Sequence, residues 1–196
     1  MSSPTSTPDP RPVPTPAAAH RAAADHFGRL VAGVRDWDAS SPVPEWTARD
    51  VVDHLVTWLP ALLAPTVTLP AGPSAEDDPV AAWTHHTTAV QALLDDPASA
   101  DLVLSNPHIG DVPVPEAVDR FYTNDVFLHS WDLARASGQE HGLDEARCAE
   151  VLAGMEPIEE MLRASGQYGP RRPVADDAPA SDRLMAFLGR DPDWRP

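Results

Sequence analysis

The sequence contains no lysine, so arginine supplies all 14 of its basic residues. This absence, beside abundant alanine, proline and aspartate, predicts a bacterial source with a GC-rich genome. Cysteine is nearly absent as well, and the single Cys148 excludes a disulfide framework and a cysteine-based zinc site. Apolar runs long enough to span a membrane as a helix are missing, so we expect no membrane association.

Positive charge is scarce, because 30 acidic residues outweigh 14 basic ones and give a formal net charge of −16. Such a chain is repelled by nucleic acid and by anionic lipid, so we expect neither as a partner. The opening stretch, MSSPTSTPDPRPVPTP, lacks the basic segment and the apolar stretch of a signal peptide. We therefore expect a cytoplasmic protein that binds a small-molecule substrate; both a monomer and a homodimer remain open.

The spacing of apolar residues predicts a single helical domain over residues 17–196, after a disordered proline-rich tail over residues 1–16. The predicted helices cover residues 17–36, 47–65, 79–96, 115–138, 144–164 and 181–188. The apolar stretch 102–104 is too short to distinguish a strand from a buried turn. Several helices without a convincing strand pair predict an all-α fold, an antiparallel helical bundle with a short extra C-terminal helix.

Local signals mark several ends of these helices. Thr47 is a good N-cap residue, and Asp50 stands where a capping box carries its acid. Ser181 is predicted to cap the last helix, and Gly138 to follow the end of the helix over residues 115–138. Pro157 predicts a kink within residues 144–164.

The helix over residues 115–138 carries an unusual polar stripe. Tyr122, Asp125, His129 and Asp132 share one face, because residues three and four apart in a helix are neighbours. The positions around them are mostly apolar, and burying an unpaired acid or imidazole costs several kcal/mol, about 2–7 for a neutral polar group. These side chains are therefore expected to bond to one another, to line a cavity or to bind a metal ion.

A third polar residue on an apolar helix face, His54, completes a possible site. Taken alone, His54 is interpreted as a core histidine whose hydrogen bonds are satisfied. Taken alone, Asp125 and His129 are interpreted as an acid–imidazole pair that is either buried and hydrogen-bonded or solvated. Together they form a His and Asp-x-x-x-His set on two helices, which is how helical bundles build metal sites. Two imidazoles and one carboxylate suit zinc, nickel or iron(II), and three protein ligands leave positions open for water or substrate.

Two residues of the stripe have alternative interpretations. Asp132 follows His129 by three residues and could orient its imidazole, or could be a surface acid paired with Arg135 or Arg163. Tyr122 could donate a hydrogen bond to a substrate, or could be a core tyrosine with a satisfied hydroxyl.

Candidates elsewhere in the chain are weaker. His108 precedes the helix over residues 115–138 in a predicted loop and could approach the site. Three tryptophans are predicted to line a pocket or the core: Trp46, Trp58 and Trp131. Cys148 reads as a small core residue rather than a nucleophile.

Three stretches give the chain a family resemblance: EWTARDVVDHLV (residues 45–56), HIGDVPVPEAVDRFYTNDVFLHSWDLARASGQ (108–139) and ASDRLMAFLGRDPDW (180–194). The chain resembles DinB-like metal-binding bundles, in the branch related to mycothiol-dependent maleylpyruvate isomerase. The resemblance implies a four-helix bundle whose divalent metal is held by His54, Asp125 and His129. The family more often carries glutamate at the position of Asp125.

The resemblance also implies a chemistry. It suggests a divalent-metal-dependent transferase or isomerase, with zinc the first expectation and nickel or iron as alternatives. The metal would activate a thiol, with mycothiol as a possible cosubstrate, or polarise an electrophilic substrate. Two other functions remain open. One is thiol-independent lyase or cyclase chemistry in a biosynthetic pathway, and the other is non-catalytic binding of a metal or ligand.

Overall fold

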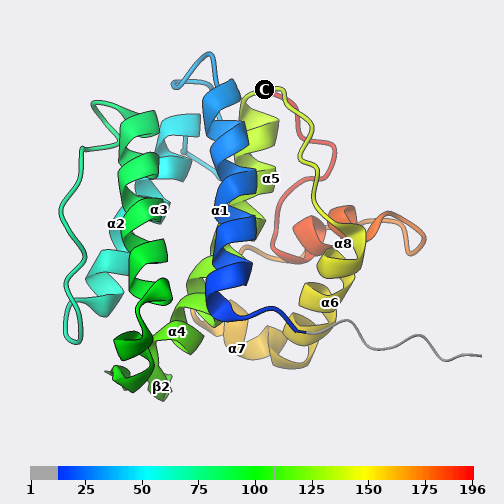
Figure 1. Ribbon diagram of the computed structural model, residues 1–196. Helices are drawn as coiled ribbons and strands as arrows, with labels where there is room; N and C mark the ends of the chain where they lie inside the picture. The colour runs from blue at the N-terminus through cyan, green and yellow to red at the C-terminus, as the bar shows by residue number, and fades with distance from the viewer. Residues whose placement is uncertain (1–12, 108) are drawn as a thin grey trace, which may run out of the picture.

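The structure is a computed structural model that describes residues 13–107 and 109–196. The predicted disordered tail therefore lies mostly outside the described residues. Four helices form the bundle, and α1 and α2 each contact both α3 and α5 (Figure 1). The bundle helices are α1 (Pro16–Gly33), α2 (Ala48–Leu63), α3 (Pro79–Asp95) and α5 (Asn124–Ala136). The predicted all-α bundle is confirmed.

Of the three helix ends predicted from Thr47, Gly138 and Ser181, the first two are confirmed. The Thr47 side chain accepts from the Asp50 backbone N–H, and the Asp50 side chain accepts from that of Thr47, so α2 begins with a complete capping box. Gly138 follows α5 with a φ of +67°, a conformation that glycine adopts without strain. Ser181 does not cap the last helix; α8 (Ala180–Phe187) begins before it. The Ser181 backbone N–H donates to Glu145 instead.

A small hairpin precedes the last bundle helix. After a short 3₁₀ turn, η1 (Pro97–Asp101), β1 (Val103–Asn106) pairs antiparallel with β2 (Gly110–Pro113). Leu104 faces Val112 in this pair, and both are buried. The apolar stretch 102–104, which the sequence left open between a strand and a buried turn, is therefore mostly strand. Each strand has only four residues, too few to show an alternating pattern.

The predicted helix over residues 115–138 is helical throughout but is not one regular α-helix. It consists of α4 (Val114–Ala117), the π-helical segment η2 (Val118–Thr123) and α5. A π-turn widens the helix locally and is common at functional sites. It lies directly before Asp125, so the polar residues of α5 keep their α-helical spacing while Tyr122 falls in the π-segment.

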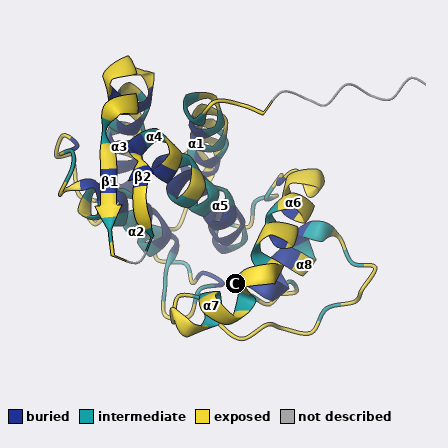
Figure 2. Cartoon of the chain, turned by 90° about the horizontal axis from the view of Figure 1, so that it is seen from below, coloured by how far each residue is buried: buried dark blue, intermediate teal, exposed yellow. Residues whose placement is uncertain are grey.

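Two hydrophobic cores share α5. The larger one fills the bundle, and the second packs the other side of α5 against α6 (Glu145–Met155) and α8. As predicted, Pro157 interrupts the helix here, with η3 (Glu156–Ile158) separating α6 from α7 (Glu159–Ala164). Seen from below, the helices of the two cores show dark buried faces, whereas α7 shows only exposed and intermediate residues (Figure 2).

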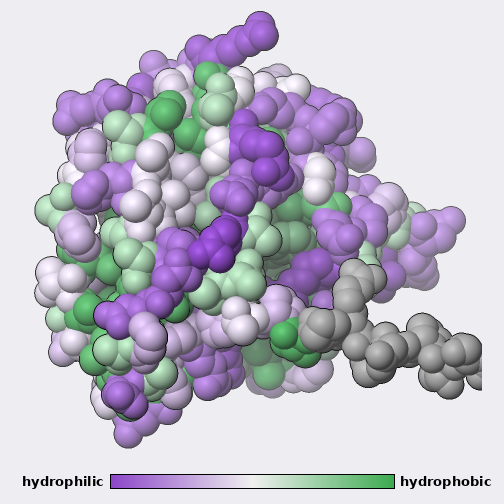
Figure 3. Space-filling view, viewed as in Figure 1, coloured by the Kyte–Doolittle hydropathy of each residue, from purple (hydrophilic) through white to green (hydrophobic). Residues whose placement is uncertain are grey.

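The outer surface carries a mixture of residue types. On the face shown in Figure 3, hydrophilic residues are interspersed with smaller hydrophobic patches. Within the described residues, no helix is both long and apolar enough to cross a membrane.

Candidate metal centre

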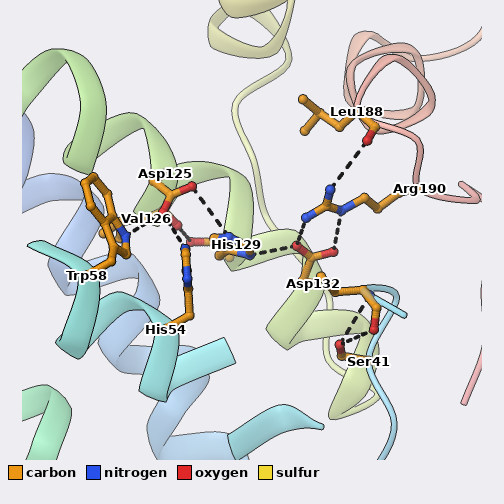
Figure 4. A network of polar contacts seen from close by, with 11 residues as sticks. Ser41, His54, Trp58, Asp125, Val126, His129, Asp132, Leu188 and Arg190 are labelled. Carbon is orange, nitrogen blue, oxygen red and sulfur yellow. Dashed lines mark hydrogen bonds and ion pairs between the residues drawn. The ribbon is translucent and has the colours of Figure 1, made fainter. Parts of the chain in front are cut away.

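The structure brings His54, Asp125 and His129 together between α2 and α5 (Figure 4). One ligand atom from each lies within 4.8 Å of the others. The carboxylate of Asp125 stands between the rings: Oδ2 is 3.0 Å from His54 Nε2, and Oδ1 is 3.5 Å from His129 Nε2. The cluster is open on one side, because 31% of the His54 side chain and 23% of the Asp125 side chain are exposed.

Local structure explains how the two helices present these groups. The capping box fixes the start of α2 at Thr47, two turns before His54. Asp125 and His129 lie four residues apart on α5 and so share a face. Trp58, one turn after His54, donates its indole N–H to Asp125 Oδ2 at 2.9 Å, which fixes the carboxylate.

His129 is held from behind by a buried carboxylate. Its Nδ1 lies 2.9 Å from Asp132 Oδ2, and the Asp132 side chain is only 1% exposed. Arg190, which follows α8, donates to both oxygens of Asp132, at 3.3 Å and 3.1 Å. Since a carboxylate only accepts hydrogen bonds, His129 Nδ1 carries the proton and Nε2 faces Asp125. This hydrogen bond leaves the Nε2 lone pair of neutral His129 available for a ligand.

The electrostatics of the cluster follow from burial and charge pairing. Burial opposes ionisation, but His129 and His54 outweigh it and hold the pKa of Asp125 below its usual range. Burial likewise opposes a charged His129, yet Asp125 and Asp132 together raise its pKa. Burial also disfavours ionised Asp132, but Arg190 and then His129 lower its pKa. Both acids are thus carboxylates at neutral pH, which is the form that binds a metal.

An aromatic ring covers the cluster from the loop before α2. The Trp46 ring lies 5.0 Å from that of His54 and stacks on His129 at 5.7 Å. The preceding residue, Glu45, has a φ of +67°, which is strained for a non-glycine residue. Hydrogen bonds hold this corner, including one from the Ser41 N–H to the Trp46 carbonyl at 2.8 Å.

The other predicted site residues are distributed differently. Tyr122 is fully buried, and its ring contacts Trp58 rather than the open side of the cluster. Trp131 is also fully buried and packs in the second core. His108 lies outside the described residues. Cys148 is fully buried in the second core, where burial raises the pKa of its thiol to about 12.

Two residues of the site were missed by sequence reasoning. Trp46 was predicted only to line the core or a pocket. Its place one residue before the Thr47 N-cap puts it at the start of α2. Arg190 had no local signal, because 58 residues separate it from Asp132. Arg135 and Arg163 were predicted as possible partners of Asp132. In the structure, Arg190 forms this ion pair instead.

The comparisons with known proteins identify the family of this chain. The fold is an all-α helical bundle of the DinB-like class. Residues 20–134 match the family described as the mycothiol maleylpyruvate isomerase N-terminal domain, and the chain belongs to this family. An uncharacterized protein in each of two Mycobacterium tuberculosis strains is 31% identical over 191 residues, covering 89% of this chain and 97% of the relative. No solved structure gives a significant match.

Proposed function

We propose that this protein is a divalent-metal-dependent enzyme of thiol-dependent transferase or isomerase chemistry. The observation that carries the proposal is the arrangement of His54, Asp125 and His129, whose ligand atoms lie within 4.8 Å of one another beside solvent. The family match supports the thiol chemistry, since its description names a mycothiol-dependent isomerase.

The residues present fit a divalent ion. Two imidazole nitrogens and one carboxylate are borderline ligands that suit zinc first, then nickel or iron(II). The supporting hydrogen bonds are already in place, from Trp58 to Asp125 and from His129 to Asp132. Hydrogen bonds of this kind orient the metal ligands, and removing them lowers metal affinity in known sites. Three protein ligands leave room for an exogenous group on the open side.

The chain's own residues set what such a site can do. A divalent ion bound here would lower the pKa of a thiol and polarise a nearby carbonyl. Trp46 and Trp58 exclude water from the flanks of the cluster, and their rings offer a flat apolar surface to a substrate. A reactive thiol must come from outside the chain, because its single cysteine, Cys148, is buried in the second core with a raised pKa. A low-molecular-weight thiol such as mycothiol fills that role.

Thermal unfolding with added mycothiol tests the proposal. A ligand of the native state raises the unfolding midpoint. We expect mycothiol to raise the midpoint of zinc-loaded protein and to have no effect on the His54→Ala variant. The His85→Ala variant, whose histidine contacts Pro70 on another part of the bundle, serves as the matched control and keeps the shift.

The same experiment separates the alternatives. Zinc binding without any thiol shift, together with turnover of an electrophile in the absence of thiol, would favour lyase or cyclase chemistry on the same bundle. Zinc binding with neither shift nor turnover would favour a non-catalytic binding protein. Failure of the wild type to bind zinc, nickel or iron(II) would contradict the metal-dependent proposal altogether.

A further inference from the structure

A second group of polar residues lies inside the bundle, in the larger core. His20 on α1, His86 on α3 and Tyr122 in η2 are 0%, 6% and 0% exposed. Both imidazole rings contact the Tyr122 ring, with centroids 6.0 Å and 5.5 Å away. Three polar side chains from three separate elements thus gather around one phenol.

Each of these side chains has a polar atom with no hydrogen-bond partner among the described residues. The atoms are His20 Nε2, His86 Nε2 and the Tyr122 hydroxyl oxygen. An unsatisfied buried donor or acceptor destabilises the folded state, and unpaired buried groups are rare in native proteins. Three such atoms around one ring indicate a common partner that is not part of the chain.

The tautomer of His20 is fixed by its neighbour. The Gln91 amide nitrogen donates to the Ala17 carbonyl at 3.2 Å and to Asp95 at 3.0 Å. The Gln91 carbonyl oxygen must therefore be the atom 2.9 Å from His20 Nδ1, and it accepts the Nδ1 proton. Nε2 of neutral His20 is then a bare acceptor.

The remaining two groups complete the pattern. Burial, followed by the charges of His20 and His85, lowers the pKa of His86 to about 4, so its ring is neutral and can accept at Nε2. Burial raises the pKa of Tyr122 well above its usual range, so the phenol keeps its proton and donates. With the His86 proton on Nδ1, the cluster offers one donor and two acceptors, and it carries no charge.

We propose that His20, His86 and Tyr122 form an internal binding site for a single water molecule. That water accepts from the Tyr122 hydroxyl and donates one proton to each imidazole Nε2. Three hydrogen bonds are the usual number for a buried water in a protein. Burial opposes a carboxylate or phosphate as the occupant, because the site holds no positive charge to pair with an anion.

The site lies behind the candidate metal centre. The Tyr122 ring contacts that of Trp58 at 5.7 Å, and Trp58 donates to Asp125. A water that fixes the Tyr122 phenol therefore supports the ring that orients the Asp125 carboxylate. The proposed water site does not depend on metal binding.

A comparison of the two tyrosines of the chain tests this site. If the water is bound, Tyr122→Phe removes one of its hydrogen bonds, and the unfolding midpoint of the full-length protein falls by about 2–4 °C. If the hydroxyl is truly unpaired, Tyr122→Phe removes an unsatisfied group, and the midpoint rises or stays the same, which would overturn the proposal. Tyr168→Phe, at a half-buried tyrosine outside the bundle core, is the matched control and leaves the midpoint unchanged.

A crystal structure of the full-length protein identifies the occupant. We expect one peak of water density within hydrogen-bonding distance of all three atoms, and its loss in Tyr122→Phe or His20→Phe crystals. A direct Tyr122–His20 hydrogen bond with no density between them would overturn the proposal. So would an anomalous signal at this position, because it would make the occupant a metal ion. Zinc binding at His54 is measured separately and does not affect either outcome.

Discussion

Asp132 accepts the Nδ1 proton of His129 at 2.9 Å from a position that is almost completely removed from solvent. A buried carboxylate behind an imidazole fixes the tautomer and raises the basicity of the ring. Here it turns Nε2 of His129 toward Asp125, so the contact between two residues on one helix decides which nitrogen faces the cluster.

Asp132→Asn tests that role directly. Asparagine keeps the size of the side chain but can present an amide donor, so it no longer enforces the Nδ1–H tautomer. We expect zinc affinity to fall about 10- to 100-fold in a chelator competition assay. Glu116→Gln, at an exposed acid on α4, is the control and should bind zinc as the wild type does. An unchanged affinity for Asp132→Asn would mean that the carboxylate is purely structural.

Arg190→Met tests the charge pairing behind Asp132. The Asp132 side chain is 1% exposed, so removing the guanidinium leaves a buried carboxylate without its cation. We expect the free energy of unfolding in urea to fall by on the order of 3 kcal/mol. Arg183→Met, at an exposed arginine on α8, should change it by less than about 0.5 kcal/mol. Recovery of stability in the Arg190→Met, Asp132→Leu double variant would identify the unpaired charge as the cause.

Asp125→Glu tests whether the side-chain length of the acidic ligand matters for metal binding. Asp125 reaches between two imidazoles while also accepting from Trp58, and glutamate adds one methylene without changing the charge. We predict that Asp125→Glu retains or tightens zinc binding, measured by titration calorimetry, whereas Asp125→Ala loses it. Loss of binding in Asp125→Glu would indicate that the carboxylate does something other than ligate the metal.

The buried histidines predict a specific loss of stability in acid. The pKa of His86 is about 4 in the folded chain against an ordinary value of 6.5, chiefly because burial disfavours the charged ring. As the pH falls from 6.5 to 4, the unfolded chain takes up this proton before the folded chain does, so stability is lost across that range. His20 adds in the same direction, since burial lowers its pKa too.

Urea unfolding at pH 7 and pH 5 measures this effect. On going from pH 7 to pH 5, His86→Phe should lose less stability than the wild type, because it lacks this buried histidine. His129, whose pKa is raised, contributes with the opposite sign but equally in both proteins. An equal loss in both proteins would show that other groups control the acid response.

Much of this fold could be predicted from local sequence signals. The capping box at Thr47 and Asp50, the break at Pro157 and the end of α5 before Gly138 depend on neighbouring residues alone. The pairing of Asp125 with His129 follows from helical periodicity in the same way. The approach of His54 to this pair needed the family resemblance, because no local rule places α2 beside α5.

Other features depend on tertiary contacts that leave no local trace. The strands of the hairpin are four residues each and form because Leu104 and Val112 bury together. The amino-acid composition of η2 gives no signal for its π-turn, and the apolar spacing there is that of a regular α-helix. Arg190 reaches Asp132 from the end of the chain, a contact that only the packed second core brings about.

Zinc stoichiometry provides the most direct test of the metal centre formed by His54, Asp125 and His129. Metal-free wild-type protein, His129→Ala and the control His85→Ala are each titrated with zinc by calorimetry. The account predicts one equivalent for the wild type and for His85→Ala, and none for His129→Ala. A wild-type protein that binds no zinc, nickel or iron(II), or a His129→Ala variant that binds one equivalent as tightly as the wild type, would contradict it.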